Sequence, residues 1–362
     1  MQYPNVLELP HGHLNFPAFL PDGTRGVVRA VSANDLAAVE MQAVVMNTFH
    51  LMLKPGASTV GTLGGLHQMS GWDGPIMTDS GGFQAYSLIR ENPKQGSINN
   101  RGLIFRQQGG KRKYQLTPEK TIQLQIGFGA DIVVCLDDCT HAGDDPATQA
   151  EAVDRTIRWA ISCREEFDRL VDEKGLAESE RPKLFAVVQG GGEKDQRKRC
   201  AEALLEIGFD GYGYGGWPLD EDYNLLEDML GTVRELIPAE YPLHALGVGH
   251  PEYVAACARM GYQMFDSALP TRDARRGRLY TFTGAEGLGG KWFKFIYMQD
   301  EEHIRSAEPI SPFCDCETCA GYSRGYLHHL FKLGDHLFYR LATIHNLRFM
   351  RLLEDRMRAA YG

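Results

Sequence analysis

The sequence has no apolar run long enough to cross a bilayer, although the chain is 362 residues long. Its first residues lack the basic and apolar regions of a secretory signal peptide, and no low-complexity tract or linker-like stretch interrupts it. Hydrophobic residues make up 43%, which supports a sizeable buried core and excludes general disorder. We therefore expect a folded cytoplasmic protein without a membrane partner.

The chain also has no excess of positive charge, because 38 Lys and Arg residues stand against 47 Asp and Glu residues, a net charge of -9. This balance argues against an indiscriminate nucleic-acid binder, since nonspecific affinity comes from contacts between cations and phosphates. The charge is uneven, however. Residues 269–362 carry a balance of +3, whereas residues 1–268 carry -12. A local patch for a polyanion is therefore allowed on an acidic body.

Several common catalytic signatures are missing. No phosphate-binding P-loop is present, and the glycine-rich stretches at 61–65 and 190–192 do not open a dinucleotide fingerprint after a first strand. Ser80 is followed by two glycines but lacks the flanking residues of a nucleophile elbow. Nucleotide hydrolysis, dinucleotide binding and serine hydrolysis are thus disfavoured.

What the sequence does contain is a rhythm of short apolar runs that alternate with helix-like segments. Helices are predicted over about Asp145–Lys174 and Lys194–Ile207, and another begins at Thr117, with Pro118 at the first helical position. This alternation predicts an α/β fold, a (β/α)₈ TIM barrel, with a doubly wound sheet as the alternative. The predicted strands are Phe16–Leu20, Ala43–Met46, Pro75–Met77, Asp131–Leu136, Leu184–Val188, Gly211–Tyr214, His244–Val248 and Gln263–Leu269.

Polar residues follow several of these strands at the end where barrel enzymes place their active sites. Any single Asp there could simply cap the next helix, but their recurrence favours a shared site. The residues that follow strands are Asn47, Asp79, Asp137, Gln189 and the pair Gly215–Gly216, and the eighth predicted strand itself carries Asp266.

Carboxylates, amides and glycine N–H groups in one mouth suit a particular chemistry. A pair of carboxylates can cleave a glycosidic bond, one as nucleophile and one as acid/base. A further carboxylate accepts hydrogen bonds from a purine ring N–H and amine, while an amide and a backbone N–H donate to its carbonyl oxygen. The pattern therefore indicates cleavage or exchange at an N-glycosidic bond to a guanine-like base.

A metal site is predicted near the C-terminus. Cys314, Cys316 and Cys319 are closely spaced, and His345 is a candidate fourth ligand. Spacing alone discriminates weakly against the other histidines of this region, which are His328, His329 and His336. Three thiolates and an imidazole leave no open position, so we expect a structural Zn²⁺ that attaches this region to a final helix at about Gly334–Ala360.

Long motifs in the sequence resemble those of the tRNA-guanine transglycosylases from about residue 5 to the C-terminus. The resemblance implies a zinc-bearing barrel that exchanges guanine at tRNA wobble position 34, in G-U-N anticodons, for a 7-deazaguanine during queuosine biosynthesis. It also implies one domain over residues 1–362, with residues 300–362 as its zinc-stapled subdomain. The motifs are Asn47–Leu51, Thr78–Gln84, Asp137–Thr140, Val188–Gly190, Gly247–Gly249, Met264–Arg272 and the Cys₃His set.

The same resemblance implies roles for individual residues. Asp266 would be the nucleophile that links to ribose C1′, and Asp79 the general acid/base. Base contacts would come from Asp137, Gln189, Gly216, Ser80, Asn47, Phe83, Leu246 and Trp217. Arg272, Arg275 and Arg276 would contact tRNA, and Tyr322, Tyr326 and His329 lie where homodimer contacts are expected, although ordinary helix packing explains the latter three equally well.

Two positions depart from the family pattern. Asp22 stands where an apolar residue is usual, and Trp217-Pro218 replaces a Leu–small pair. The Trp217–Pro218 peptide has no N–H and presents only an acceptor. We therefore expect an amine-bearing base, 7-aminomethyl-7-deazaguanine or queuine, with Asp22 as a second acceptor or, alternatively, as a partner of Arg25.

Two other functions remain open from the sequence. One is a paralogue that inserts a 7-deazaguanine into DNA or another RNA. The other is a non-catalytic, zinc-stapled RNA-binding subunit, which the intact motifs around Asp79 and Asp266 disfavour.

Overall fold

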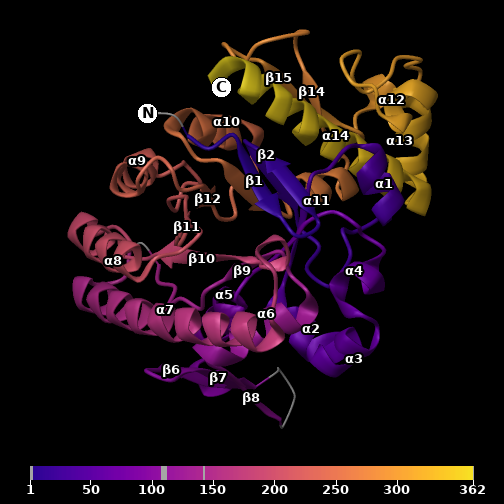
Figure 1. The fold of residues 1–362 in the computed structure, drawn as a ribbon. Helices are drawn as coiled ribbons and strands as arrows, with labels where there is room; N and C mark the ends of the chain where they lie inside the picture. Colours follow the sequence, from indigo (N-terminus) through magenta and orange to yellow (C-terminus); the bar gives the residue numbers. More distant parts are fainter. Residues whose placement is uncertain (1–2, 107–111, 142, 362) are drawn as a thin grey trace.

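The computed structural model describes residues 3–106, 112–141 and 143–361. Parallel strands lie at its centre, with helices around them (Figure 1). The eight-stranded sheet has the order β3 (Ala18–Pro21), β13 (Met264–Ser267), β12 (Leu243–Ala245), β11 (Gly211–Tyr214), β10 (Lys183–Val188), β9 (Ile132–Val134), β5 (Ile76–Thr78) and β4 (Val44–Met46). Its two edges meet at a parallel bridge between Asp22 and Val45, where Gly23 N–H donates to Val45 O at 2.7 Å. This closure confirms the predicted barrel and excludes the doubly wound sheet.

Each barrel strand overlaps one of the eight predicted runs, with ends that differ by a few residues. Alternate side chains fill the barrel interior, among them Leu20, Val45, Val134 and Met264, while the others pack against the helices.

The predicted helices are also present, and their caps explain where they begin. Thr117 Oγ1 accepts a hydrogen bond from Lys120 N at 3.1 Å, and Asp145 accepts from Ala147 N and Thr148 N at 3.0 Å. The helices are α1 (Ala33–Ala38), α2 (Thr48–Leu51), α3 (Ala57–Thr62), α4 (Gly65–Ser70), α5 (Gly82–Glu91), α6 (Pro118–Phe128), α7 (Pro146–Lys174), α8 (Lys194–Ile207), α9 (Glu227–Leu236), α10 (Pro251–Met260), α11 (Leu269–Arg275), α12 (Glu317–Gly321), α13 (Arg324–Leu333) and α14 (His336–Tyr361).

Short antiparallel strands outside the barrel were not among the predicted elements. They are β1 (Val6–Leu9), β2 (Gly12–Asn15), β6 (Gly96–Asn99), β7 (Gly102–Arg106), β8 (Lys113–Leu116), β14 (Arg278–Phe282) and β15 (Phe293–Tyr297). The β6–β8 sheet lies outside α6 and α7 in Figure 1. Its Phe105 ring packs on Phe49 of α2, with centroids 4.9 Å apart.

Helix α14 attaches the C-terminal region to the barrel. Glu354 is fully buried, and its carboxylate accepts hydrogen bonds from Phe19 N and from Gln42 Nε2, both at 2.7 Å. Burial raises the pKa of Glu354 to about 7 despite these donors and the nearby Arg351 and Arg358. None of the helices in the described part of the chain has both the length and the apolar character needed to span a membrane.

Candidate active site

The strand registers bring the predicted side chains to one end of the barrel. In the β4–β5 ladder, Met46 pairs with Thr78, so the next residues, Asn47 and Asp79, lie side by side. Asn47 Nδ2 donates to Asp79 Oδ2, and Asn47 Oδ1 accepts from His50 N at 2.9 Å. One amide therefore caps α2 and holds Asp79 at the same time.

Asp79 is surrounded by donors and by other carboxylates. Its Oδ1 accepts from Thr48 N at 2.9 Å and from Gly81 N at 3.2 Å. Removal from solvent nevertheless raises the pKa of Asp79 to about 7, and the negative charges of Asp266 and Asp22 add to this rise. A carboxyl group with this pKa can give and take a proton near neutral pH.

Asp266 lies at the end of β13 and is held through one oxygen. Its Oδ1 is 2.8 Å from His244 Nε2 and accepts a second hydrogen bond from Gly247 N at 3.0 Å. The side chain of Asp266 is 20% exposed, whereas His244 is buried. This carboxylate is therefore oriented and still accessible from the cavity.

Asp137 and Gln189 form a second polar pair. Gln189 Nε2 donates to Asp137 Oδ2 at 2.6 Å, and burial raises the pKa of Asp137 to about 6 although this bond lowers it. Gln189 Oε1 is buried without a hydrogen-bond partner among the described residues. Gly215 leaves room for this amide, because a Cβ there would lie 2.6 Å from Gln189 Cδ. Gly216 has φ of +86°, a conformation that favours glycine.

A cavity of about 420 Å³ opens between these side chains. Gln189 is buried and is not among the lining residues of the cavity, so its contact with a base stays a prediction. Phe83 and Trp217 are exposed at the cavity, with ring centroids 5.5 Å apart in an edge-on arrangement. The other predicted site residues line the cavity: Asn47, Asp79, Ser80, Asp137, Gly216, Leu246 and Asp266.

The two unusual positions also lie at this cavity. Trp217, Pro218 and Asp22 all line it. Asp22 Oδ1 accepts from Thr24 N at 2.9 Å and from the Thr24 hydroxyl. No ion pair between Asp22 and Arg25 forms within the described residues, so the alternative pairing with Arg25 is not seen.

The arginines that follow Asp266 do not all remain available for a ligand. Arg278 binds Asp273 through both its Nε and Nη2, at 2.9 and 2.8 Å. Arg272 and Arg276 are exposed at α11, and burial lowers the pKa of Arg275, which the charges of Arg29, Arg272 and Arg276 lower further. The local cationic cluster therefore consists of Arg272, Arg275, Arg276 and, unpredicted, Arg29.

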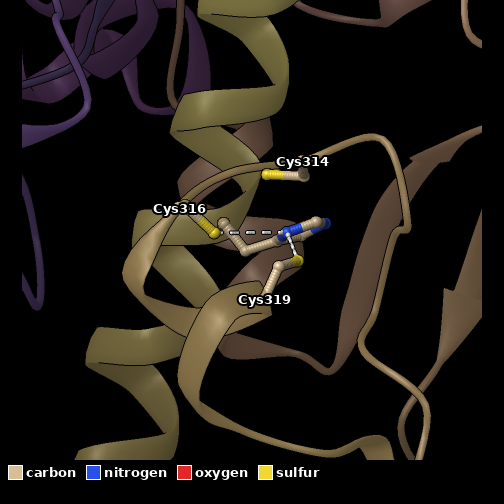
Figure 2. A group of neighbouring side chains, drawn as sticks. Cys314, Cys316 and Cys319 are labelled. Atoms are coloured by element: carbon tan, nitrogen blue, oxygen red, sulfur yellow. Dashed lines mark hydrogen bonds between the residues drawn. The ribbon is translucent and has the colours of Figure 1, made fainter.

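The C-terminal cysteines converge as predicted. The Sγ atoms of Cys314, Cys316 and Cys319 and one imidazole nitrogen of His345 all lie within 4.8 Å of one another, and Figure 2 shows the three cysteine side chains around a common point. His345 Nε2 is 2.6 Å from Tyr280 O, which leaves Nδ1, 3.2 Å from Cys319 Sγ, as the ligand atom. The donor set fits a closed tetrahedral metal site.

This arrangement also decides between the histidines. His328 Nδ1 instead contacts Met298 O at 2.7 Å, so His328 is used elsewhere. His345, on α14, is the histidine that completes the group.

Comparison with known proteins identifies the family to which the chain belongs. The sequence profile described as "Queuine tRNA-ribosyltransferase" matches residues 5–361. The chain belongs to the queuine tRNA-ribosyltransferase family. It is 38% identical to the queuine tRNA-ribosyltransferase of Solidesulfovibrio magneticus, over 98% of this chain and 89% of that protein. Identity to the proteins of the same name from Halothermothrix orenii and Novosphingobium aromaticivorans is 36% and 37%, over 98% of this chain and 88% and 90% of theirs.

Membership of the queuine tRNA-ribosyltransferase family makes the chain an enzyme of the pentosyltransferase class. Family membership thus confirms the predicted resemblance and reaction class.

Sequence reasoning missed some residues of this queuine tRNA-ribosyltransferase site. His244 contacts Asp266, Thr48 holds Asp79, and Tyr214 lines the cavity. The signal for His244 was present, because a histidine that alternates with apolar neighbours on a barrel strand points into the barrel. Thr48 lies in the Asn47–Leu51 motif, but its role depends on tertiary contacts, because its backbone N–H donates to Asp79 Oδ1 and its hydroxyl to Asp79 O.

Proposed function

We propose that this enzyme exchanges guanine at wobble position 34 of G-U-N anticodon tRNAs for an amine-bearing 7-deazaguanine. The observation that carries this proposal is the pairing of two different carboxyl groups in one cavity. Asp79 has a pKa of about 7, and Asp266 is anchored through Oδ1 by two donors. An acid and a nucleophile are what double displacement at a glycosidic carbon requires.

The exchange proceeds in two balanced steps. An Asp266 oxygen forms a bond to ribose C1′ while the C1′–N9 bond breaks, and the departing guanine takes that electron pair together with the Asp79 proton. The Asp79 carboxylate then removes a proton from the incoming base, whose nitrogen attacks C1′. The C1′–Asp266 bond breaks, and its electron pair returns to the carboxylate.

Base recognition falls to the remaining groups of the cavity. Asp137 offers carboxylate oxygens to a ring N–H and an exocyclic amine, with Ser80 and Gly216 beside it. Gln189 holds Asp137 in place through its 2.6 Å hydrogen bond. Phe83 and Leu246 supply the apolar surfaces between which a flat base would lie, and Asn47 fixes the acid Asp79.

The substituent at the 7-position of the base would contact the loop that follows β11. The Trp217–Pro218 peptide can only accept a hydrogen bond, and the half-buried carboxylate of Asp22 adds negative charge to the same cavity. Both groups favour an ammonium or amine over a nitrile. The base would be 7-aminomethyl-7-deazaguanine or queuine.

Other parts of the molecule would bind the tRNA, hold the metal and form the dimer. Arg272, Arg275 and Arg276 would contact the anticodon backbone as cations next to the mouth. Zn²⁺ at Cys314, Cys316, Cys319 and His345 would have a structural role and would hold residues 300–362 as a subdomain of one domain. The enzyme would act in the cytoplasm as a homodimer, with the stacked Tyr322 and Tyr326 and the exposed His329 at the interface.

The test is a competition between bases. The protein is incubated with an anticodon stem-loop containing U-G-U and with 7-aminomethyl-7-deazaguanine, queuine or the 7-cyano base, and the modified nucleoside is identified by mass. We expect incorporation of an amine-bearing base at the central G. Preferred incorporation of the cyano base would contradict the assignment of Trp217–Pro218. Modification of a DNA hairpin in place of the RNA would favour the paralogue.

A further inference from the structure

His244 is a buried polar side chain that the exchange reaction described above does not use. It lies on β12 between Leu243 and Ala245, which pack outward against the helices, and it lines the active-site cavity. Only 1% of its side chain is exposed. A histidine so deeply placed needs a hydrogen-bond partner, and among the residues described in the structure its side chain bonds to Asp266.

The contact fixes which oxygen of Asp266 is engaged. An ionised carboxylate only accepts hydrogen bonds, so His244 Nε2 carries the hydrogen and donates to Oδ1 at 2.8 Å. Gly247 N donates to the same oxygen at 3.0 Å. Oδ2 receives no hydrogen bond from the residues that the structure describes. The carboxylate is thus divided into one anchored and one unengaged oxygen.

We propose that His244 is a positioning residue for Asp266, directing Oδ2 to ribose C1′ and stabilising the carboxylate when it departs. This role rests on the proposed function, because it requires that Asp266 form the covalent link. In the first step the Oδ2 lone pair bonds to C1′, and Oδ1 becomes the ester carbonyl, still held by His244 and Gly247.

The same two donors act in the second step. When the incoming base attacks C1′, the C1′–Oδ2 bond breaks and its electron pair spreads over both carboxylate oxygens. Hydrogen bonds to Oδ1 are stronger to the full carboxylate than to the ester carbonyl. They therefore lower the barrier to release of the nucleoside, in the manner of an oxyanion hole.

Two variants separate a hydrogen-bonding role from a packing role. His244→Gln retains an N–H donor close to the position of Nε2, whereas His244→Phe keeps a flat ring of similar size without a donor. The native chain and both variants are mixed with the anticodon stem-loop, and covalent protein–RNA adduct is followed on denaturing gels. Base is then added, and the decay of the adduct gives the rate of the second step.

We expect His244→Phe to slow adduct decay about ten- to a hundred-fold, the range for a lost hydrogen bond to a charged group. His244→Gln should recover most of the native rate. Melting temperature and metal content of each variant confirm that it is folded.

The outcomes discriminate between the claims. Native decay in a folded His244→Phe variant, or decay in His244→Gln as slow as in His244→Phe, would overturn the role of His244 alone. Absence of any adduct with the native chain would contradict the proposed function itself, and the positioning role with it.

Discussion

Asp79 owes its proposed role to its surroundings. Two backbone donors and Asn47 would favour the carboxylate, but loss of solvent and the neighbouring Asp266 and Asp22 outweigh them, and the pKa rises from 3.8 to about 7. Because the folded-state pKa is raised, the proton is present below about pH 7 and is lost above it. The departing guanine needs that proton, so acid catalysis should fade on the alkaline side.

A pH profile of single-turnover adduct formation tests this assignment. We expect the rate to fall as pH rises through about 7 in the native enzyme, and Asp79→Asn to lower the rate about 10²- to 10⁴-fold without that inflection. Asp22→Asn is the matched control, since it removes a neighbouring charge but no proposed proton donor. It should keep adduct formation, which does not involve the incoming base, and move the inflection to lower pH. An unchanged inflection in the pH profile of Asp79→Asn would show that a group other than Asp79 causes it.

For individual residues, the sequence predicted the members of the site from their residue type and their position on a strand. Asn47 and Asp79 follow strands and Asp266 lies near the end of one, so a correct strand assignment was enough to bring them together. The contact of Gln189 with Asp137 depends on the β9–β10 register and on the space left at Gly215. Neither is readable from one sequence, because register is set by packing across the whole barrel.

The elements α12 and α14 meet at the Cys₃His group. Cys316 and Cys319 belong to the cap and body of α12, and His345 lies inside α14. Thr318 Oγ1 also donates to Leu341 O at 2.7 Å, so α12 and α14 are joined beside the metal ligands. A bound ion would therefore stabilise the packing of α12 on α14 and take no part in the reaction.

Metal analysis and melting of a ligand variant test this role. We expect one Zn²⁺ per chain in the native protein, and loss of the metal with a clearly lower melting temperature in Cys319→Ser. Cys257→Ala, at a buried cysteine outside the group, should retain the metal. Full metal content in Cys319→Ser would contradict the assigned ligand set.

The accuracy of the sequence prediction differs between kinds of element. Barrel strands and long helices were predicted because apolar runs and caps such as Thr117 are local signals. The short strands β6–β8 were not, because they are stabilised by tertiary contacts such as Phe105 on Phe49. The non-local pairing of β14 with β15 has the same explanation, since its inner residues pack on α14.

The free positive charge of the whole molecule is distributed differently from what the net charges of residues 1–268 and 269–362 implied. Several arginines of the basic C-terminal quarter are paired, including Arg340 with Asp35 and Glu317, and Arg348 with Glu40 and Asp315. The exposed Arg272 and Arg276 next to the mouth have no carboxylate partner among the described residues. Affinity for RNA should therefore depend on a few cations at one place.

Salt dependence of stem-loop binding tests this distribution. We expect Arg272→Ala and Arg276→Ala each to weaken binding and to reduce the slope of log affinity against log salt by about one. Lys198→Ala on α8, an exposed cation paired with Glu202, should leave both quantities unchanged. Equal slopes in all of these variants would place the RNA elsewhere.

The central claim is that Asp266 forms a covalent bond to the ribose from which guanine departs. The most direct test incubates the native enzyme and the variants Asp266→Ala and Asp266→Asn with the stem-loop and then denatures each mixture. The products are examined by intact mass and by peptide analysis. We predict one adduct in the native enzyme, with the mass of the stem-loop less guanine, on the peptide that contains Asp266. Neither variant should form it. Base exchange without an adduct, or an adduct on another carboxylate such as Asp79, would contradict the account.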